Sequence, residues 1–275
     1  MAYTTIDDPS AYFKVQLYTG DGNDGHAITF DDTDTTMTPD LVICKGRSFA
    51  DDNTVFDSVR GANKWMATNR NYQSDDNADP NFGVKSFDSD GFTLGQWSAL
   101  NRSSETHVAW CWKAGTTSGI NTTGSDITPS AYSFNQTSGF SIVKYTGNQT
   151  SDTQVAHGLG AVPGLVIAKD LENGADWVVY HHKNTSAPET DVLVLNANYA
   201  TADHADRWSD TAPTSVNFTV GDGDQANINN TLIAYCFAEK QGFSKFGSFT
   251  GNGDNEGPFL YCGFTPSWFM SKRTD

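Results

Sequence analysis

A short segment recurs three times along the chain, and this internal repeat limits the possible folds more than any other feature. The segment Tyr18-Thr19-Gly20-Asp21-Gly22 is matched by Tyr145-Thr146-Gly147-Asn148-Gln149 and by Phe249-Thr250-Gly251-Asn252-Gly253. Each aromatic residue is followed, 17 to 21 residues later, by a proline that opens an apolar run ending in lysine, at residues 39–45, 163–169 and 266–272. Landmarks that recur in a fixed order indicate tandem copies of one structural unit.

Two further landmarks occur only in the first two copies. Residues 91–95 match 217–221, and residues 107–113 match 232–238. We therefore expect an N-terminal arm and a linker around two repeats, with bounds of 1–11 for the arm, 12–115 for the first repeat, 116–139 for the linker, 140–240 for the second repeat and 241–275 for the rest. This last stretch is expected to be either the start of a third repeat in a longer array, which we favour, or a hairpin that completes the second unit.

The composition predicts an all-β fold in which each repeat is a β-sandwich, of jelly-roll or lectin-like type. The chain has 25 Gly, 17 Phe, 10 Tyr and 7 Trp, and charged residues make up only 18% of it. Apolar and polar residues alternate at 141–145 and 215–220, which is typical of half-buried strands. The continuous apolar runs 165–168 and 177–180 favour strands covered on both faces, at the centre of a sandwich. Helix is expected to be nearly absent.

The formal net charge of −16 excludes some partners. An acidic surface repels nucleic acid and anionic headgroups, so neither is expected as a partner. The sequence contains no apolar run of about 18 residues, so membrane insertion is not expected. Residues 1–20 lack a signal-peptide pattern. The four cysteines stand far apart and are expected to be free thiols, with Cys44, Cys111 and Cys236 inside apolar strands.

Two groups of residues suggest metal binding. Asp222 and Asp224 form a Gly-Asp-Gly-Asp sequence that is a candidate for a structural Ca²⁺ site, although no twelve-residue calcium loop with a terminal glutamate is present. His181 and His182 follow a predicted strand, and because adjacent residues on a strand point to opposite faces, the two side chains should not share one ion. No other cofactor is expected.

The sequence offers no catalytic motif. Nucleophile elbows, phosphate-binding loops and HExxH motifs are all missing, so no enzymatic activity is expected. Trp65, Trp97, Trp177 and Trp208 have two interpretations. They either pack in the core, as large aromatic residues in a sandwich usually do, or form platforms on which sugar rings stack.

Several segments together resemble a known family. These are the opening residues 1–20, Phe87-Asp88-Ser89-Asp90-Gly91-Phe92-Thr93-Leu94-Gly95, Val108-Ala109-Trp110-Cys111-Trp112-Lys113-Ala114-Gly115 and Pro163-Gly164-Leu165-Val166-Ile167-Ala168-Lys169. Over nearly the whole chain the sequence is similar to repeat-containing virion proteins of marine bacteriophages, including cyanophages. The arrays of that family usually continue past the match to residues 268–275, and the family supplies no catalytic residue.

This resemblance implies a virion structural protein that is made in the host cytoplasm. The expected function is a tail fibre or tail-associated adhesin that takes part in host attachment and receptor binding. The expected partners are other virion proteins, further copies of the chain, with a trimer favoured, and a host-surface glycan or outer-membrane protein. A capsid decoration or protrusion protein is the alternative, and a polysaccharide depolymerase is a third reading.

Overall fold

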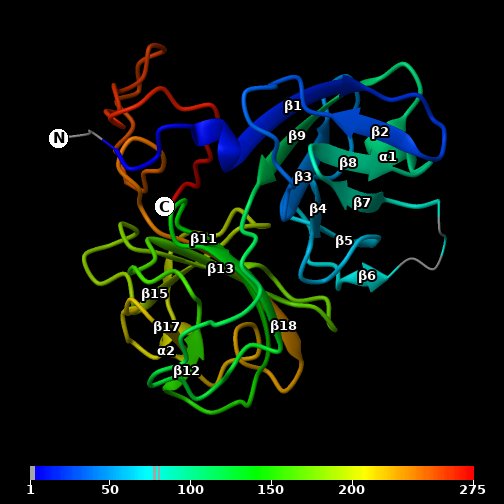
Figure 1. Cartoon of the computed structure of the whole chain (residues 1–275). Coiled ribbons are helices and arrows are strands. Elements are labelled where there is room, and N and C mark those ends of the chain that lie inside the picture. The colour runs from blue at the N-terminus through cyan, green and yellow to red at the C-terminus, as the bar shows by residue number, and fades with distance from the viewer. Residues whose placement is uncertain (1–3, 77–78, 80) are drawn as a thin grey trace.

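The chain folds almost entirely into antiparallel β-sheets, as the composition predicts. A computed structural model describes residues 4–76, 79 and 81–275. Its helices are a 3₁₀ turn, η1 (Pro9–Ala11), and two helices of one turn each, α1 (Ser98–Asn101) and α2 (Ala205–Trp208). Figure 1 shows the strands gathered into two units, with the C-terminal segment lying beside both.

The first unit is a sandwich of a large and a small sheet. The large sheet has the strand order β1-β9-β3-β4-β5-β6, and the small sheet has the order β2-β8-β7. The strand bounds are β1 Phe13–Thr19, β2 His26–Thr29, β3 Leu41–Gly46, β4 Thr54–Asp57, β5 Lys64–Ala67, β6 Asp75–Asp76, β7 Val84–Asp88, β8 Gly91–Leu94 and β9 Thr106–Trp112.

The second unit repeats this plan with one strand added at an edge of the large sheet and one strand fewer in the small sheet. Its large sheet has the order β10-β11-β18-β13-β14-β15-β16, and β12 pairs with β17 in the small one. The strand bounds are β10 Ala131–Asn135, β11 Phe140–Thr146, β12 Thr153–Ala156, β13 Leu165–Asp170, β14 Val178–His181, β15 Asp191–Val194, β16 Ala202–Asp203, β17 Asn217–Val220 and β18 Thr231–Phe237.

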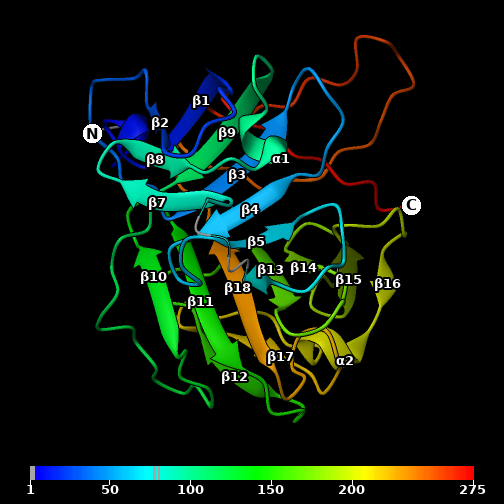
Figure 2. The ribbon, with the colours of Figure 1, turned by 90° about the vertical axis from the view of Figure 1, so that its right-hand side faces the viewer.

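The sequence repeat is therefore a repeat of topology. The last long strand of each unit, β9 or β18, lies between the first strand and the proline-opened strand, β1 and β3 or β11 and β13. Figure 2 shows the two large sheets facing each other, with the small sheets outside them. The tandem β-sandwich fold predicted from the sequence is confirmed.

Three apolar clusters hold the molecule together. One lies inside the first sandwich, around Phe56 and Phe92, and a second lies inside the second sandwich, around Tyr145 and Phe218. The third lies between the two large sheets. Strand β13 explains why its apolar run is continuous, because Val166 and Ala168 face its own sandwich while Leu165 and Ile167 face the other unit.

Buried polar groups join the two units across this third cluster. Tyr235 of β18 donates its hydroxyl to Asp57 Oδ2 of β4 at 2.7 Å, and Asp57 also binds the buried Arg60 guanidinium. Trp177 donates from Nε1 to the carbonyl of Ala67 at 3.0 Å. The two units are thus packed against each other through a shared apolar cluster and buried hydrogen bonds.

Two segments outside the repeats differ in structure, since residues 116–139 contain a strand and residues 241–275 are irregular. Strand β10 arises within residues 116–139, which the sequence assigns to a linker, and it pairs with β11. Residues 241–275 contribute no strand to either large sheet. They run as irregular chain along the molecule, and Trp268 packs edge-on against Trp112 with ring centroids 5.2 Å apart.

Candidate functional site

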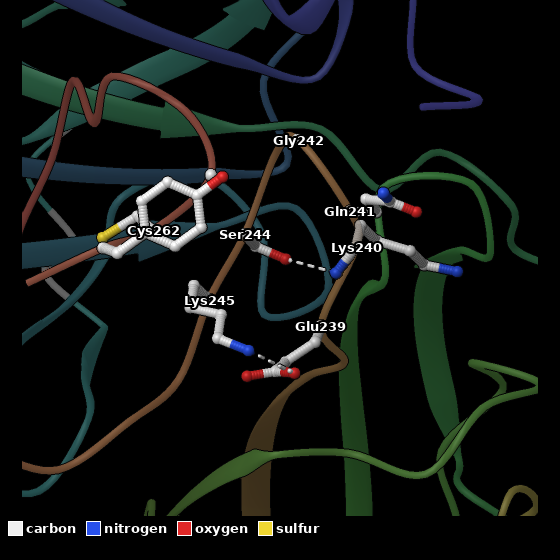
Figure 3. A pocket seen from close by; sticks show the side chains of 9 residues that line it. Glu239, Lys240, Gln241, Gly242, Ser244, Lys245 and Cys262 are labelled. Carbon is white, nitrogen blue, oxygen red and sulfur yellow. Dashed lines mark hydrogen bonds and ion pairs between the residues drawn. The ribbon is translucent and has the colours of Figure 1, made fainter. Parts of the chain in front are cut away.

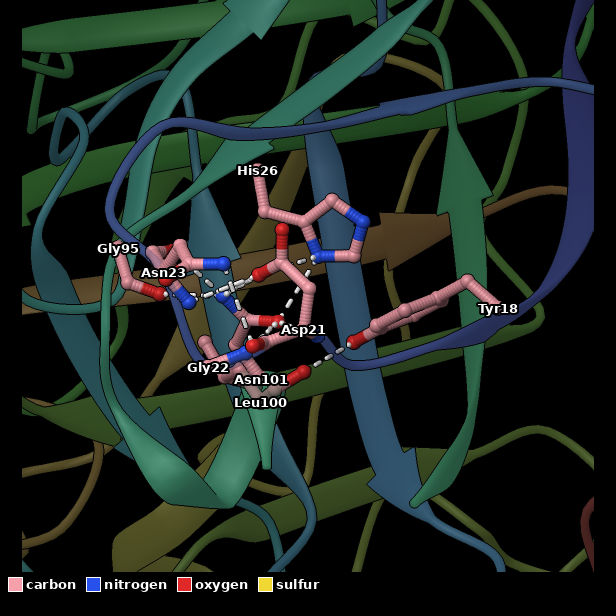
Figure 4. A network of polar contacts seen from close by, with 8 residues as sticks. All are labelled: Tyr18, Asp21, Gly22, Asn23, His26, Gly95, Leu100 and Asn101. Carbon is pink, nitrogen blue, oxygen red and sulfur yellow. Dashed lines mark hydrogen bonds and ion pairs between the residues drawn. The ribbon is translucent and has the colours of Figure 1, made fainter. Parts of the chain in front are cut away.

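The repeated Thr-Gly-Asp segment lies against a buried asparagine, which we call the asparagine latch. In the first unit this residue is Asn101, the last residue of α1, whose side chain is fully buried. Its Oδ1 accepts from the backbone amide of Asp21 at 2.9 Å, and its Nδ2 donates to the carbonyls of Asn23 at 2.8 Å and Gly95 at 3.0 Å. Figure 4 shows these contacts converging on one side chain.

The second unit builds the same latch around Asn227. Its Oδ1 accepts from the amide of Asn148 at 2.9 Å, and its Nδ2 donates to the carbonyls of Thr150 at 2.9 Å and Gly221 at 2.7 Å. Since Asn148 replaces Asp21, the carboxylate of the first unit is not needed for the contact.

The aromatic residue and the glycine of the repeat complete the latch. Tyr18 donates its hydroxyl to the Leu100 carbonyl at 2.9 Å, as Tyr145 does to the carbonyl of Ala226 at 2.7 Å. A Cβ on Gly147 would lie 2.1 Å from the carbonyl oxygen of Ile228, so only glycine permits this approach. The repeated motif is a structural turn.

The calcium candidates Asp222 and Asp224 lie on the surface. Both are exposed, whereas the glycines between and before them are buried against the backbone of α2, where the amide of Gly223 donates to the Asp206 carbonyl at 2.8 Å. Among the residues that the structure describes, no three His, Cys, Asp or Glu side chains are grouped so that they could hold a metal ion. The glycines of this loop are therefore explained by packing.

The adjacent histidines lie at the end of a strand, next to the C-terminal segment. Strand β14 ends at His181, so the alternation of side-chain directions stops there. The two imidazole rings lie 5.7 Å apart, and both approach Phe246, whose carbonyl is 3.3 Å from His182 Nε2. Burial, followed by the neighbouring His182, lowers the pKa of His181. Their common neighbour is the C-terminal segment.

A surface hollow lies where this C-terminal segment leaves the second unit. Figure 3 shows its lining, which includes Glu239, Lys240, Ser244, Lys245 and Cys262. Lys245 Nζ pairs with Glu239 Oε2 at 3.4 Å, and the Ser244 hydroxyl accepts from the Lys240 amide at 3.0 Å. The lining has two lysines and one glutamate, so the pairing of Lys245 with Glu239 leaves about one positive charge to attract a ligand.

The four candidate tryptophans divide into two classes. Trp177 and Trp208 are 1% and 2% exposed, so they belong to the core. Trp65 and Trp97 are half-buried and lie 5.0 Å apart at one end of the first unit. The sugar-platform interpretation therefore applies only to this second pair.

Two further aromatic residues extend that pair into a cluster, which we call the aromatic platform. Phe82 stacks on Trp97 with ring centroids 4.3 Å apart, and Tyr72 meets Trp65 edge-on at 6.2 Å. Tyr72 is 46% exposed. The strands and loops that carry these residues are separate in sequence, so the fold alone brings the four rings together.

Polar groups surround the aromatic platform. Trp65 Nε1 donates to Asp75 Oδ2 at 3.2 Å, and the guanidinium of Arg70 lies 6.0 Å from the Tyr72 ring. Asp52 accepts from Arg70 at 2.8 Å and from Asn69 at 2.7 Å. Partial burial opposes the effect, but these hydrogen bonds lower the pKa of the Asp52 carboxyl. Apolar faces beside carboxylate, amide and guanidinium groups can bind a sugar ring by stacking and by hydrogen bonds to its hydroxyls.

The second unit has no such surface at the matching position. Trp65 lies opposite Asp75 in the β5–β6 pair, and Val192 holds the same place opposite Ala202 in the β15–β16 pair. Val192 is buried in the core cluster that also contains Trp208. The two units thus share a fold and differ in what they present to solvent.

Only part of this site could be predicted from the sequence. It singled out Trp65 and Trp97, but it did not single out Tyr72 or Phe82 and did not connect Asp75 or Asp52 with them. A local signal exists, because residues 64–72 combine Lys, Trp, Arg and Tyr close to an acidic stretch. That signal cannot be told from an ordinary exposed hairpin without the fold.

Comparison with known proteins assigns a family without a function. Residues 8–275 match the model of a family described as a domain of unknown function, DUF7483, so the chain belongs to that family. No curated protein and no solved structure matches the chain. In the described part of the chain, no helix has the length and hydropathy needed to cross a bilayer.

Proposed function

We propose that this chain is a bacteriophage virion structural protein, a tail fibre or tail-associated adhesin, which attaches to the host surface by binding a glycan on the aromatic platform. The observation that carries the proposal is the platform itself. Four large aromatic side chains lie together, partly exposed and surrounded by hydrogen-bonding groups, in only one of two units that otherwise share a topology. The resemblance to phage virion proteins supplies the biological setting.

Trp65 and Trp97 pack partly against the core of the first unit, and Tyr72 is 46% exposed, so the platform keeps ring surface that a ligand could cover. Removal of apolar surface from water contributes about 25 cal/mol per Å², and a tryptophan or tyrosine carries a large area. The second unit shows the alternative, in which Val192 is buried at the matching position. The aromatic residue at this position is thus specific to the first copy, which supports a role that the second copy does not share.

The charge of the protein narrows the class of glycan. With a net charge of −16, the surface repels strongly anionic polysaccharides. Asp52 and Asp75 offer acceptors to sugar hydroxyls, whereas Arg70 is already paired with Asp52. A neutral host glycan fits these groups best. The proposal assigns binding without catalysis, so cleavage of the bound polysaccharide by the purified protein would contradict it.

Competition for host adsorption tests the attachment role. Excess purified protein should slow the adsorption of phage to host cells, because it occupies the same receptor. The double substitution Trp65→Ala with Trp97→Ala should abolish the competition, and Tyr199→Ala should not, since Tyr199 is an exposed aromatic residue of the second unit, 60% exposed. Equal competition by all three proteins would rule out the platform as the receptor site.

Two accompanying measurements separate the remaining readings of the partner and of the location. Treatment of the cells with protease should leave binding intact if the receptor is a glycan, and should remove it if the receptor is an outer-membrane protein. Quantitative mass spectrometry of purified virions should find a few tens of copies or fewer. Hundreds of copies per virion would support a capsid decoration protein instead.

A further inference from the structure

The outer edge of strand β1 is open, whereas the matching edge in the second unit is covered. Strand β11, the counterpart of β1, pairs with β18 on one side and with β10 on the other. Strand β1 pairs with β9 and is the end strand of its sheet. Figures 1 and 2 show β1 at the margin of the first unit, with β9 beside it.

A difference of seven residues accounts for this edge. Both units contain the sequence Pro-Ser-Ala-Tyr, at 9–12 and 129–132. In the second unit residues 133–139 follow and make the β10 hairpin, and β11 then begins at Phe140. In the first unit Phe13 follows Tyr12 directly, so the hairpin that supplies the covering strand is missing.

The backbone of β1 is ready to accept another strand. The amide of Lys113 donates to the carbonyl of Tyr12 and the amide of Gly20 donates to the carbonyl of Glu105, which fixes the even-numbered residues of β1 as those that bond to β9. The amides of Val15 and Leu17 therefore point outward, and neither has a partner among the described residues. Within the part of the chain that the structure describes, the Leu17 carbonyl accepts from the adjacent Gln16 side chain alone, at 2.9 Å.

The side chains of this edge are apolar. Val15 and Leu17 are 38% and 52% exposed, and they lie on the same face of the strand as Phe13. The one charged residue of β1, Lys14, is buried and donates to the carbonyls of Asp32 and Thr35 at 2.6 Å. A long edge strand with exposed apolar residues and no outward charge is a template for strand pairing. By contrast, β6 and β16, the far ends of the two large sheets, have only two residues each.

We propose that β1 pairs antiparallel with β1 of a second copy of this chain, so that the two large sheets of the first units become one continuous sheet. The strand is self-complementary in the register that places Gln16 opposite Gln16. Val15 then lies opposite Leu17 of the second copy in both directions, which gives two apolar cross-strand pairs and no like charges face to face. Such a contact is isologous and closes on two copies, in place of the trimer that the fibre resemblance implies.

The neighbouring loop predicts how salt affects this pairing. Asp31, Asp32 and Asp34 are exposed, and the loop is held beside β1 because Gln16 Nε2 donates to Asp31 Oδ2 at 2.9 Å. In the dimer the two acidic loops approach each other and repel. Salt screens that repulsion, since the Debye length falls from about 30 Å at 0.01 M to about 10 Å at 0.1 M. Self-pairing should therefore tighten as salt rises, whereas a basic foreign strand would bind more weakly.

Sedimentation velocity of the full chain across concentration and salt tests the pairing. The wild type should show a monomer–dimer equilibrium that is at least about tenfold tighter at high salt than at low salt. Leu17→Lys should be monomeric under both conditions, because it places charges beside each other at the new contact. Val162→Lys is the matched control and should dimerise as the wild type does, since Val162 is 56% exposed and lies outside the strands.

A second variant and a second measurement exclude a folding defect. Val15→Pro removes an amide that points outward and leaves the β9 bonds intact, as an edge strand tolerates. It should keep the wild-type circular dichroism and lose the dimer. Hydrogen exchange at the Val15 and Leu17 amides should slow with protein concentration, while exchange at Lys14 should not change. A wild type that stays monomeric, or a dimer that survives both substitutions, would overturn the proposal, and neither result depends on glycan binding.

Discussion

Replacement of the latch asparagine Asn227 by alanine should destabilise the protein far more than its size suggests. The side chain makes four hydrogen bonds, to the amide and the side chain of Asn148, to the Thr150 carbonyl and to the Gly221 carbonyl. Because Asn227 is fully buried, water cannot readily take its place as the hydrogen-bond partner of these groups in the alanine variant. At about 1 kcal/mol net for each bond, and more for a group left unsatisfied, the loss should be about 3–5 kcal/mol.

Urea unfolding followed by tryptophan fluorescence measures this loss. The two units share a core cluster, so we expect one cooperative transition whose midpoint falls while its slope stays constant. Asn101→Ala should produce a similar shift, because it breaks the equivalent latch of the first unit. Asn229→Ala is the matched control in the same loop, since its one side-chain contact, to Gln149, is exposed. It should cost less than about 0.5 kcal/mol.

Equal urea midpoints for Asn227→Ala, Asn101→Ala and Asn229→Ala would refute the structural role assigned to the latch asparagines. Losses of less than about 1 kcal/mol for both Asn101→Ala and Asn227→Ala would mean that the repeated segment does not depend on the latch. In that case the recurrence of the aromatic-Thr-Gly motif would need another explanation than the structural turn.

Three further predictions concern buried groups. Burial lowers the pKa of His157 to about 4, against an ordinary 6.5, so between these values the unfolded state binds a proton that the folded state does not. The contribution to stability should be full above about pH 6.5, and the free energy of unfolding should fall by about 3 kcal/mol as the pH drops to 4. In urea unfolding at several pH values, His157→Gln should make the free energy of unfolding depend less on pH. Burial raises the pKa of Cys44 and Cys236 to about 12 and that of Cys111 well above its usual range, so a thiol reagent should label only Cys262 rapidly in the native protein and all four cysteines after unfolding; fast native labelling at Cys111 would contradict the buried assignment. Asp57→Ala leaves the Arg60 guanidinium buried without its carboxylate and should lower the free energy of unfolding by about 3–5 kcal/mol. Tyr235→Phe removes one donor and should lower it by about 1–2 kcal/mol. If both variants unfolded at the same urea concentration as the wild type, the interface would not depend on these buried polar groups.

The architecture could be predicted from the sequence because the repeat and the strand patterns are local signals. The segment 88–91, Asp-Ser-Asp-Gly, has the residues that turns favour, and it connects β7 to β8. The continuous apolar run 165–168 was expected to be covered on both faces, and it is. The alternation of apolar and polar residues along a strand indicates whether one face or both faces are buried, and it can be recognised in the sequence alone.

The sequence alone could not predict which part of the chain covers the second face of β13. A buried face does not reveal what covers it, so Leu165 and Ile167 gave no sign that they pack on the other repeat. The same limit applies to the tryptophans. Trp65 and Trp177 are the same residue type near similar strands, and only the neighbouring elements decide that one is half-exposed and the other enclosed. The ring directions of His181 and His182 depended on where β14 ends, which propensity fixes poorly.

Binding of the purified protein to an array of bacterial surface glycans tests the central claim most directly. The wild type should bind one or more neutral glycans, and Trp65→Ala with Trp97→Ala should weaken that binding at least about tenfold, because the stacking faces are lost. Tyr199→Ala should bind as the wild type does. Glycan binding that is unchanged by loss of the two tryptophans would contradict the account, as would a wild type that binds no glycan.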